Sequence, residues 1–247
     1  MKVQVITLFP GMLEAPLAAS MVGIARERGA LDLRLVQLRD FCMDKHHTAD
    51  DTPYGGGGGM VLKAEPIGKA VMACKAADPD AKVIYLSPQG KRLDHAVAAR
   101  LAASPGLILL CGRYEGADQR ALDRWVDEEI SLGDFVLSGG ELPAACLVEA
   151  VARLLPGVLG NEGSAPADSF FDGLLDFPHY TKPAEVEGRK VPEVLLSGDH
   201  ARIAAWRREE ALKATFFKRP DLLEKVGLSA RDRQVLEGLG WKEGKER

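Results

Sequence analysis

One stretch, Leu107 to Pro143, constrains the fold of this chain more than any other. It contains two apolar runs, Leu107–Cys111 and Ile130–Leu137, and each run leads into a glycine-rich turn. Glycine lets the main chain bend sharply and approach a ligand without a Cβ atom in the way. Because ligands of open α/β sheets bind beyond the carboxyl ends of the strands, we expect a binding site at the turns Gly112–Gly116 and Gly139–Gly140.

Short apolar runs alternate with helical patterns along the first 155 residues. The runs are rich in Val, Ile and Leu and largely unbroken, which is typical of strands covered on both faces. The alternation predicts an α/β fold with a parallel sheet flanked by helices. The predicted strands are Val3–Phe9, Leu33–Leu38, Val83–Ser87, Leu107–Cys111 and Ile130–Leu137. The predicted helices are Met12–Arg28, Ala64–Ala77, Asp94–Ala103, Gly116–Trp125 and Glu141–Leu155.

A change in the character of the sequence marks a domain boundary. The segment Leu159–Asp168 carries Gly, Asn, Ser and Pro with almost no apolar anchor, as interdomain linkers do. Helices are expected after it near Asp199–Lys218, Asp221–Val226 and Ala230–Leu239, the first of them capped by Asp199. We therefore expect a sheet domain over residues 1–159, a linker over 160–172 and a small C-terminal helical domain over 173–247.

Composition narrows the class of protein. With 46% apolar and 28% charged residues, the chain has the composition of a globular protein. The cysteines form no Cys-x-x-Cys pair and have mostly apolar neighbours, so we expect reduced, buried thiols in a cytoplasmic protein. These cysteines are Cys42, Cys74, Cys111 and Cys146. We expect neither a signal peptide nor a membrane-spanning segment.

The formal net charge of −4 is unevenly distributed. Six basic side chains accompany two acidic ones from His200 to Arg219, whereas three arginines stand among nine acids from Arg113 to Glu149. A polyanion would therefore meet the carboxy-terminal part first. A solvated helix face explains the same charges equally well.

Two features resemble metal or phosphate sites without matching either. The consecutive residues His46 and His47 cannot readily aim at one ion, and no cysteine accompanies them, so a structural zinc site is not predicted. The tract Gly55–Gly59 lacks the Gly-Lys-Ser/Thr ending of a nucleotide-hydrolysing P-loop. A mobile loop that folds over a substrate remains the interpretation of this tract.

Three polar residues have ordinary structural explanations. Asp168, at the end of the linker, suits a helix or turn cap. Arg153 follows Glu149 by four residues, which is the spacing of a surface ion pair on a helix. Glu115 suits the first turn of a helix, where a carboxylate interacts favourably with the helix dipole. Residue type alone therefore assigns none of them to catalysis.

Taken together, the separated motifs resemble the bacterial tRNA (guanine-N1-)-methyltransferases, a family in the SPOUT class of S-adenosylmethionine-dependent RNA methyltransferases. The motifs follow the family's order along nearly the whole chain: Ile6–Pro10, Pro53–Met60, Leu86–Gly90, Gly112–Gly116, Ile130–Pro143, Gly173–Pro183, Ser197–His200 and Trp206–Arg207. The resemblance implies a deep trefoil knot and an obligate homodimer. Periodicity alone predicts a plain open sheet, because true knots are essentially absent from proteins.

The resemblance also implies which residues act. Asp168 would reach the cofactor bound by the other subunit and take the N1 hydrogen of the guanosine immediately 3′ of the tRNA anticodon. Arg153 would stabilise the charge that develops on O6, and Glu115 would orient the cofactor or the guanine. The residues implied to hold S-adenosylmethionine are Tyr85, Leu86, Ser87, Pro88, Gly112, Tyr114, Glu115, Gly116, Ser131, Leu132, Gly133, Asp134, Phe135, Val136, Leu137, Gly139 and Gly140.

Recognition of tRNA is expected on the basic helix of the C-terminal part. Its cations would neutralise backbone phosphates, and the linker would close as the guanosine is flipped into the site. The residues expected to bind tRNA are Arg202, Trp206, Arg207, Arg208 and Lys213. Tyr114 or Phe171 would stack on the flipped base, unless each simply packs in the core. Magnesium dependence is associated with the family, but no carboxylate cluster in the sequence identifies a Mg²⁺ site.

Two other functions stay open at this point. A knotted methyltransferase acting on the ribose 2′-OH would need a base for a hydroxyl and a different appended domain. A noncatalytic RNA-binding protein would keep the glycine turns only as structure. Both Arg153 and Asp168 stand in motif context, which favours the enzyme over the noncatalytic protein.

Overall fold

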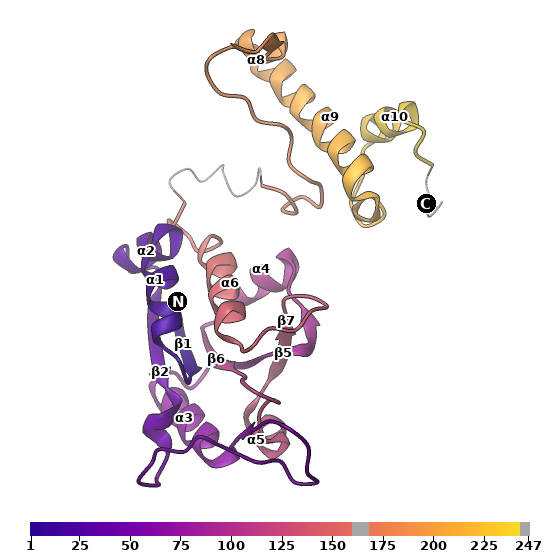
Figure 1. Cartoon of the computed structure of the whole chain (residues 1–247). Helices are drawn as coiled ribbons and strands as arrows, with labels where there is room; N and C mark the ends of the chain where they lie inside the picture. The colour runs from indigo at the N-terminus through magenta and orange to yellow at the C-terminus, as the bar shows by residue number, and fades with distance from the viewer. Residues whose placement is uncertain (160–167, 243–247) are drawn as a thin grey trace. The chain divides into compact units, whose positions relative to one another are not determined.

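The computed structural model describes residues 1–159 and 168–242 of the chain. The chain divides into two compact units, Met1–Gly160 and Asn161–Arg247 (Figure 1). The boundary between the units falls inside the linker expected over 160–172, of which residues 160–167 lie outside the described part.

The first unit is built on a five-stranded sheet with the strand order β2-β1-β6-β5-β7. Its strands are β1 (Lys2–Thr7), β2 (Asp32–Gln37), β5 (Lys82–Arg92), β6 (Gly106–Cys111) and β7 (Glu128–Ser131). Every neighbouring pair in this sheet is parallel. The predicted parallel α/β sheet flanked by helices is therefore confirmed.

Helices cover both faces of this sheet (Figure 1). One face packs against α1 (Gly11–Ala18), α2 (Ser20–Glu27), α4 (His95–Ala102) and α6 (Glu141–Ala152). The other packs against α3 (Ala64–Ala77), α5 (Gln119–Trp125) and the 3₁₀ helix η1 (Leu38–Phe41). The side chains of β6 alternate between these two cores, so its central position explains the unbroken apolar run of the sequence.

Several predicted elements have different bounds in the structure, among them the strand predicted over Val83–Ser87, which extends to Arg92. The helix predicted over Met12–Arg28 is interrupted at Ala19, which is extended, and at Ser20, whose φ of 52° lies in the left-handed region. The helix predicted from Gly116 starts only at Gln119, because Asp118 caps it. The strand predicted over Ile130–Leu137 ends at Ser131, and the apolar residues after it form a turn-rich segment.

Within residues 168–242, the second unit contains helices and one small hairpin. Its elements are the hairpin of β8 (Glu185–Val186) and β9 (Arg189–Lys190), then α8 (Glu193–Leu196), α9 (His200–Lys218), the 3₁₀ helix η2 (Pro220–Leu222) and α10 (Ala230–Gly238). The helix predicted over Asp221–Val226 is wrong, since only the short η2 forms there. Asp199 caps α9 as expected, because its carboxylate accepts hydrogen bonds from the N–H groups of Ala201 and Arg202.

The cysteines are free, and three of them are buried. Cys146 is exposed, so the prediction of a buried thiol is wrong at this position. Its neighbours Ala144, Leu147 and Val148 occupy the core-facing side of α6, which leaves Cys146 on the outer side. None of the helices within residues 1–159 and 168–242 combines the length and apolarity that crossing a bilayer requires.

Candidate functional site

A cavity of about 350 Å³ opens at the carboxyl ends of β6 and β7, beside the middle of β5. Three stretches of chain form most of its lining: Tyr85–Gln89 within β5, Gly112–Ala117 after β6, and residues between Glu129 and Gly140, which lie in β7 and after it. The pairing of β5 with β7 is interrupted between Leu86 and Lys91, so the backbone there is free to form part of the wall. The cavity lies where the glycine turns predicted a binding site.

Most of the residues implied to hold the cofactor line this cavity, and Asp134 does not. The Phe135 N–H donates to the carbonyl of Gly133 at 2.9 Å, and this turn leaves Asp134 exposed at its middle position. Sequence reasoning missed several lining residues: Gln89, Ala117, Gln119, Leu122, Glu129, Ile130 and Pro143. Arg113 and Ser138 also line the cavity, inside the turn and the segment that were predicted to hold the donor, whereas nothing in the sequence pointed to Glu129.

The two glycine turns are joined by a backbone hydrogen bond. The Gly140 N–H donates to the carbonyl of Gly112 at 2.8 Å. A Cβ atom on Gly140 would lie 2.7 Å from Cys111 Cα and 2.9 Å from Gly112 N, both of which are backbone atoms. Gly140 is therefore required by close approach of two chain segments, at the wall of the cavity.

The turn after β6 has an unusual backbone conformation. Tyr114 has a φ of 59° and Gly116 a φ of 124°, and the Gly116 N–H donates to the carbonyl of Arg113 at 3.0 Å. Non-glycine residues with positive φ are uncommon, and they cluster at functional sites. Cys111, just before this turn, is fully buried, and burial raises the pKa of its thiol well above the usual value. The Cys111 thiol is thus protonated at neutral pH and unsuited to nucleophilic attack.

A buried ion pair fixes the first turn to the start of α6. The side chain of Glu141 is only 1% exposed, and its Oε2 lies 3.2 Å from Arg113 Nε. Its Oε1 accepts a hydrogen bond from Thr7 Oγ1 at 2.8 Å, and Arg113 Nη1 donates to the carbonyl of Ser138 at 3.1 Å. Removing one partner of a buried pair typically destabilises a protein by about 3–5 kcal/mol. This network therefore holds both cavity turns against the end of β1.

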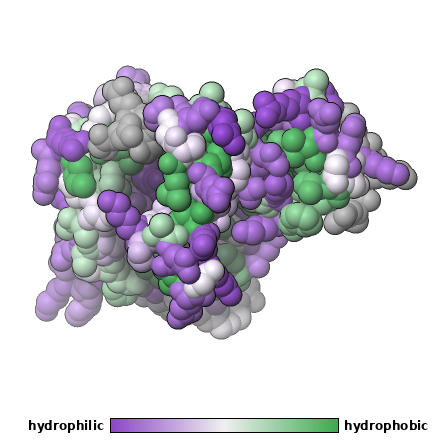
Figure 2. All heavy atoms as spheres, turned by 90° about the horizontal axis from the view of Figure 1, so that it is seen from above, coloured by the Kyte–Doolittle hydropathy of each residue, from purple (hydrophilic) through white to green (hydrophobic). Residues whose placement is uncertain are grey.

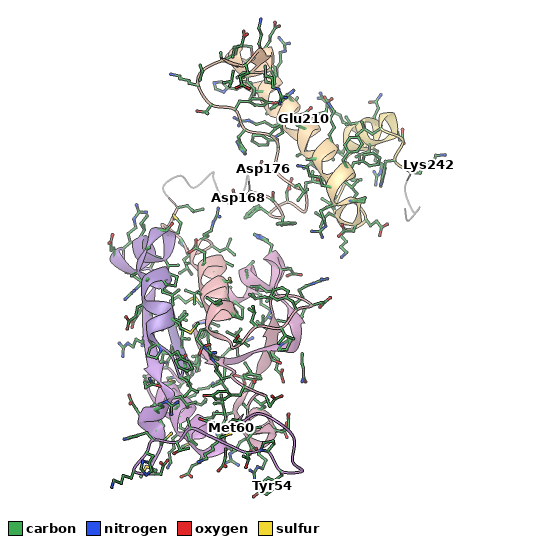
Figure 3. The ribbon with its side chains drawn as sticks, viewed as in Figure 1. Tyr54, Met60, Asp168, Asp176, Glu210 and Lys242 are labelled. Carbon is green, nitrogen blue, oxygen red and sulfur yellow. The ribbon has the colours of Figure 1, made fainter. Side chains whose placement is uncertain are left out.

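The glycine tract approaches the cavity through Glu115. The Glu115 N–H donates to the carbonyl of Met60 at 3.0 Å, and a Cβ atom on Gly59 would overlap the Glu115 side chain. The short strands β3 (Asp50–Asp51) and β4 (Val61–Leu62) pair and close this loop at its base. Tyr54 and Met60 mark its two sides in Figure 3. Its closing over a substrate stays a prediction.

Arg153 and Asp168 do not line the cavity. Arg153 is the C-cap of α6, whereas Gly140 at the cavity is the N-cap of the same twelve-residue helix. At 1.5 Å per residue, these two ends lie about 20 Å apart. Asp168 belongs to the second unit, where the Phe171 N–H donates to its carbonyl oxygen at 3.3 Å (Figure 3).

The basic residues expected to bind tRNA lie on α9 and differ in their partners. Arg208 forms ion pairs with Asp172 at 2.6 Å and with Asp232 at 3.0 Å. Lys213 pairs with Glu209 and Glu210, and these hydrogen bonds raise the pKa of its ammonium group. Arg202 and Arg207 have no acidic partner among the residues that the structure describes. Counting charges along the sequence therefore overstated the free positive charge of this helix.

Aromatic rings lie beside Arg207 and Trp206 of α9. The Arg207 guanidinium lies 4.8 Å from the centre of the Phe177 ring, and the rings of Trp206 and Tyr180 are 6.4 Å apart. Arginines beside aromatic rings are common in single-stranded RNA sites, where bases stack. That Trp206 and Arg207 contact tRNA stays a prediction.

Large apolar side chains are exposed beside the cavity. Phe135 is 55% exposed, Val136 is 83% exposed and Leu142, on the first turn of α6, is 51% exposed. Hydrophobic side chains also lie among hydrophilic ones on the face seen in Figure 2. Exposed apolar groups gathered at one place mark binding surfaces more often than isolated ones do.

The potential metal ligands among the described residues are scattered. Within residues 1–159 and 168–242, no group of three or more His, Cys, Asp or Glu side chains could hold an ion. The Asp44 carboxylate accepts from the N–H groups of His46 and Thr48, so it shapes the turn that carries the two histidines.

Comparisons with known proteins agree with the motifs. A family model described as "tRNA (Guanine-1)-methyltransferase TrmD" matches residues 1–225. Proteins named tRNA (guanine-N(1)-)-methyltransferase are similar along nearly the whole chain. One from Geobacter metallireducens is 53% identical, with 96% of each chain covered. One from Magnetococcus marinus is 54% identical, with 97% of this chain and 96% of the relative covered. The resemblance seen in the sequence is confirmed, and the chain belongs to the tRNA (guanine-1)-methyltransferase family.

Proposed function

We propose that the protein transfers a methyl group from S-adenosylmethionine to N1 of the guanosine immediately 3′ of the anticodon in tRNA. The observation that carries this proposal is the cavity at the two glycine turns. Its volume of about 350 Å³ lies within the range of small-molecule sites. Main-chain groups of Gly112–Gly116 and Gly139–Gly140 can contact the donor there, and the Glu115 and Glu129 carboxylates suit its positive charge.

Calorimetric titration with S-adenosylmethionine tests this assignment. One donor molecule is expected to bind per chain, with a negative heat-capacity change because the apolar wall is buried. Absence of binding would contradict the proposal. A ribose 2′-OH methyltransferase would pass this test too, so the nucleoside product must also be identified.

Replacing Gly140 by Ala is expected to weaken S-adenosylmethionine binding by about tenfold or more, since overpacking of this kind costs about 1–3 kcal/mol. The added methyl group would meet the backbone of Cys111 and Gly112 and push the two turns apart. Gly11→Ala is the matched control, because a Cβ atom there meets nothing within 4 Å. Calorimetry of both variants measures the effect, and equal affinity in the two would contradict the role of the turns.

The chemistry needs a base and a stabiliser of negative charge. Guanine N1 becomes nucleophilic only as its hydrogen leaves, and the Asp168 carboxylate can accept that proton. Charge then develops on O6, where the Arg153 guanidinium can donate planar, charge-assisted hydrogen bonds. S-adenosylmethionine supplies the methyl group when bound. Glu115, at the cavity wall, orients the donor or the guanine.

A homodimer would bring these residues together. Arg153 lies a helix length from its own cavity, and Asp168 belongs to the other unit of the chain. We propose that Asp168 of the partner subunit, and with it Arg153 of the partner subunit, completes each cavity. The exposed residues Leu142 and Cys146, one turn apart on α6, suit a buried position in such an interface.

Replacing Leu142 by Glu is expected to shift the protein from dimer to monomer, because a charged group buried in an apolar interface is strongly unfavourable. Sedimentation velocity at several protein concentrations measures the shift. Met72→Glu is the control, because Met72 is also exposed, at 64%, but lies on α3 at the opposite face of the sheet. A Leu142→Glu protein that stays dimeric would exclude this face from the interface.

The course of the chain after β7 supports a trefoil knot. β7 is an edge strand. Its residues Ile130 and Ser131 pair with Lys91 and Arg92, the last two residues of β5. The chain then returns to the centre of the sheet, where Gly140 bonds to Gly112 beside β6. We propose that this return is the threading implied by the family, and that residues 1–159 form the knotted domain.

Recognition of tRNA would use the helical part over residues 173–247. Arg202, Trp206 and Arg207 are the members of the predicted set with free charge or an aromatic face. The proposed closure of the linker involves residues 160–172, of which residues 160–167 lie outside the described part. A cytoplasmic location and a Mg²⁺ requirement belong to the same proposal and rest on the family resemblance.

A further inference from the structure

Arg208 holds three separate parts of the second unit together. Its Nε and Nη2 donate to the two oxygens of Asp232 on α10, at 3.2 and 3.0 Å, as a bidentate pair. Its Nη1 donates to Asp172 Oδ2 at 2.6 Å. Asp232 is 5% exposed and also accepts from the Ser229 N–H at 3.0 Å. The guanidinium in the middle of α9 thus joins α10 to the segment that begins at Asp168.

That segment is a folded loop held on α9 at a second point. The Leu175 N–H donates to Thr215 Oγ1 at 2.9 Å, and Thr215 is fully buried. Within the loop, the Phe170 N–H donates to the carbonyl of Leu174 at 2.7 Å, and the Asp176 N–H to Ser169 Oγ at 2.9 Å. The loop therefore has a defined shape, and the contact between Asp172 and Arg208 lies four residues from Asp168.

The same contacts make Arg208 unsuited to binding phosphate. Two carboxylates surround one guanidinium, so the group of three side chains carries a net negative charge at neutral pH. Its donors on Nε, Nη1 and Nη2 already have carboxylate acceptors in a planar arrangement that lysine cannot reproduce. A tRNA phosphate would have to displace Asp172 or Asp232 to reach it.

We infer that Arg208 is a positioning residue for Asp168, not a tRNA contact. Through Asp172 it fixes the loop that carries Asp168 to α9 and α10, and so it sets where the carboxylate stands when the guanine arrives. This inference rests on the proposed function, in which Asp168 removes the N1 proton. A carboxylate misplaced by about 1 Å is expected to lose up to a hundredfold in rate.

Single-turnover methyl transfer and tRNA binding, measured on the full-length enzyme, separate the two roles. For Arg208→Lys and Asp172→Asn, we expect the rate constant at saturating tRNA and donor to fall by about tenfold to a hundredfold. The dissociation constant for tRNA and its salt dependence should stay close to the wild-type values. Arg207→Ala is the contrasting variant, which should weaken tRNA binding and reduce the slope against salt by about one.

Asp172→Asn keeps the test decisive if Arg208 variants fold poorly. The Asp172 side chain is 52% exposed, and the change removes its charge but keeps its shape. If Arg208 contacted phosphate, freeing it from Asp172 would tighten tRNA binding and leave the saturated rate intact. That result, or a raised tRNA dissociation constant with a normal saturated rate in Arg208→Lys, would overturn the inference. Loss of rate in Asp168→Asn with none in these variants would overturn the inference alone, whereas a fully active Asp168→Asn would overturn the proposed function.

Discussion

Replacing Asp168 by Asn is expected to slow single-turnover methyl transfer by about 10²- to 10⁴-fold, which is the usual contribution of a positioned general base. Asparagine keeps the shape of the side chain but cannot accept the N1 proton of guanine. The affinities for S-adenosylmethionine and tRNA should therefore stay near the wild-type values. Rapid-quench measurement with radiolabelled donor gives the rate constant, and Asp221→Asn, which alters an exposed ion pair with Arg219, is the control. A near-normal rate in Asp168→Asn would exclude the base.

A mixture of two impaired variants, assayed at a donor concentration too low for Gly140→Ala to bind it appreciably, tests whether Asp168 acts across the dimer. Asp168→Asn leaves its own cavity intact, and Gly140→Ala leaves its own Asp168 intact. A dimer of one chain of each kind would have one complete site only if the base comes from the partner. Random pairing of equal amounts should restore about a quarter of the wild-type activity. A mixture as inactive as its components would place the base in the same chain as the cavity.

Replacing Arg153 by Lys is expected to reduce the rate constant by about 10²- to 10³-fold, as does the loss of a donor to a developing oxyanion. Lysine keeps the positive charge but lacks the planar pair of N–H groups that suits O6 and its neighbour. The same rapid-quench assay measures the loss. Donor binding should not change, because Arg153 acts on the charge that develops on O6 only during methyl transfer.

The alternative for Arg153 is an ordinary ion pair with Glu149, one turn earlier on α6. Such surface pairs contribute about 0.3–0.5 kcal/mol, far less than the loss expected here. Glu149→Gln removes the pair and keeps Arg153, so its rate should stay near the wild-type value. Equal losses in Glu149→Gln and Arg153→Lys would favour the ion pair over the catalytic role.

The sequence predicted the sheet because burial on both faces leaves a clear signal. The run Leu107–Cys111 is apolar at every position, and β6 is buried at every position. The same reasoning overextended the strand after Ile130. Leu132–Leu137 is largely apolar, but it forms exposed turns at the cavity, and an apolar pattern cannot distinguish a buried strand from a binding surface.

Contacts between residues far apart in the sequence could not be predicted, as Arg208 in the second unit shows. Arg208 was counted as a free cation, and its partners Asp172 and Asp232 are 36 and 24 residues away. The break between α1 and α2 depends on the left-handed backbone of Ser20, which has no signature in residue type. The location of the cavity was predictable because glycine-rich turns mark sharp bends of the backbone, which depend on local sequence. Glu129 lies in the cavity wall only because β7 pairs with β5, which local sequence does not indicate.

Methyl transfer to two tRNA transcripts is the most direct test of the proposed reaction. One transcript carries guanosine immediately 3′ of the anticodon, and the other carries adenosine there. After incubation with enzyme and S-adenosylmethionine, mass spectrometry of the digested nucleosides should detect 1-methylguanosine in the first transcript and no methylated nucleoside in the second. A 2′-O-methylated nucleoside, equal methylation of both transcripts, or no methylation of the first would contradict transfer to N1 of that guanosine.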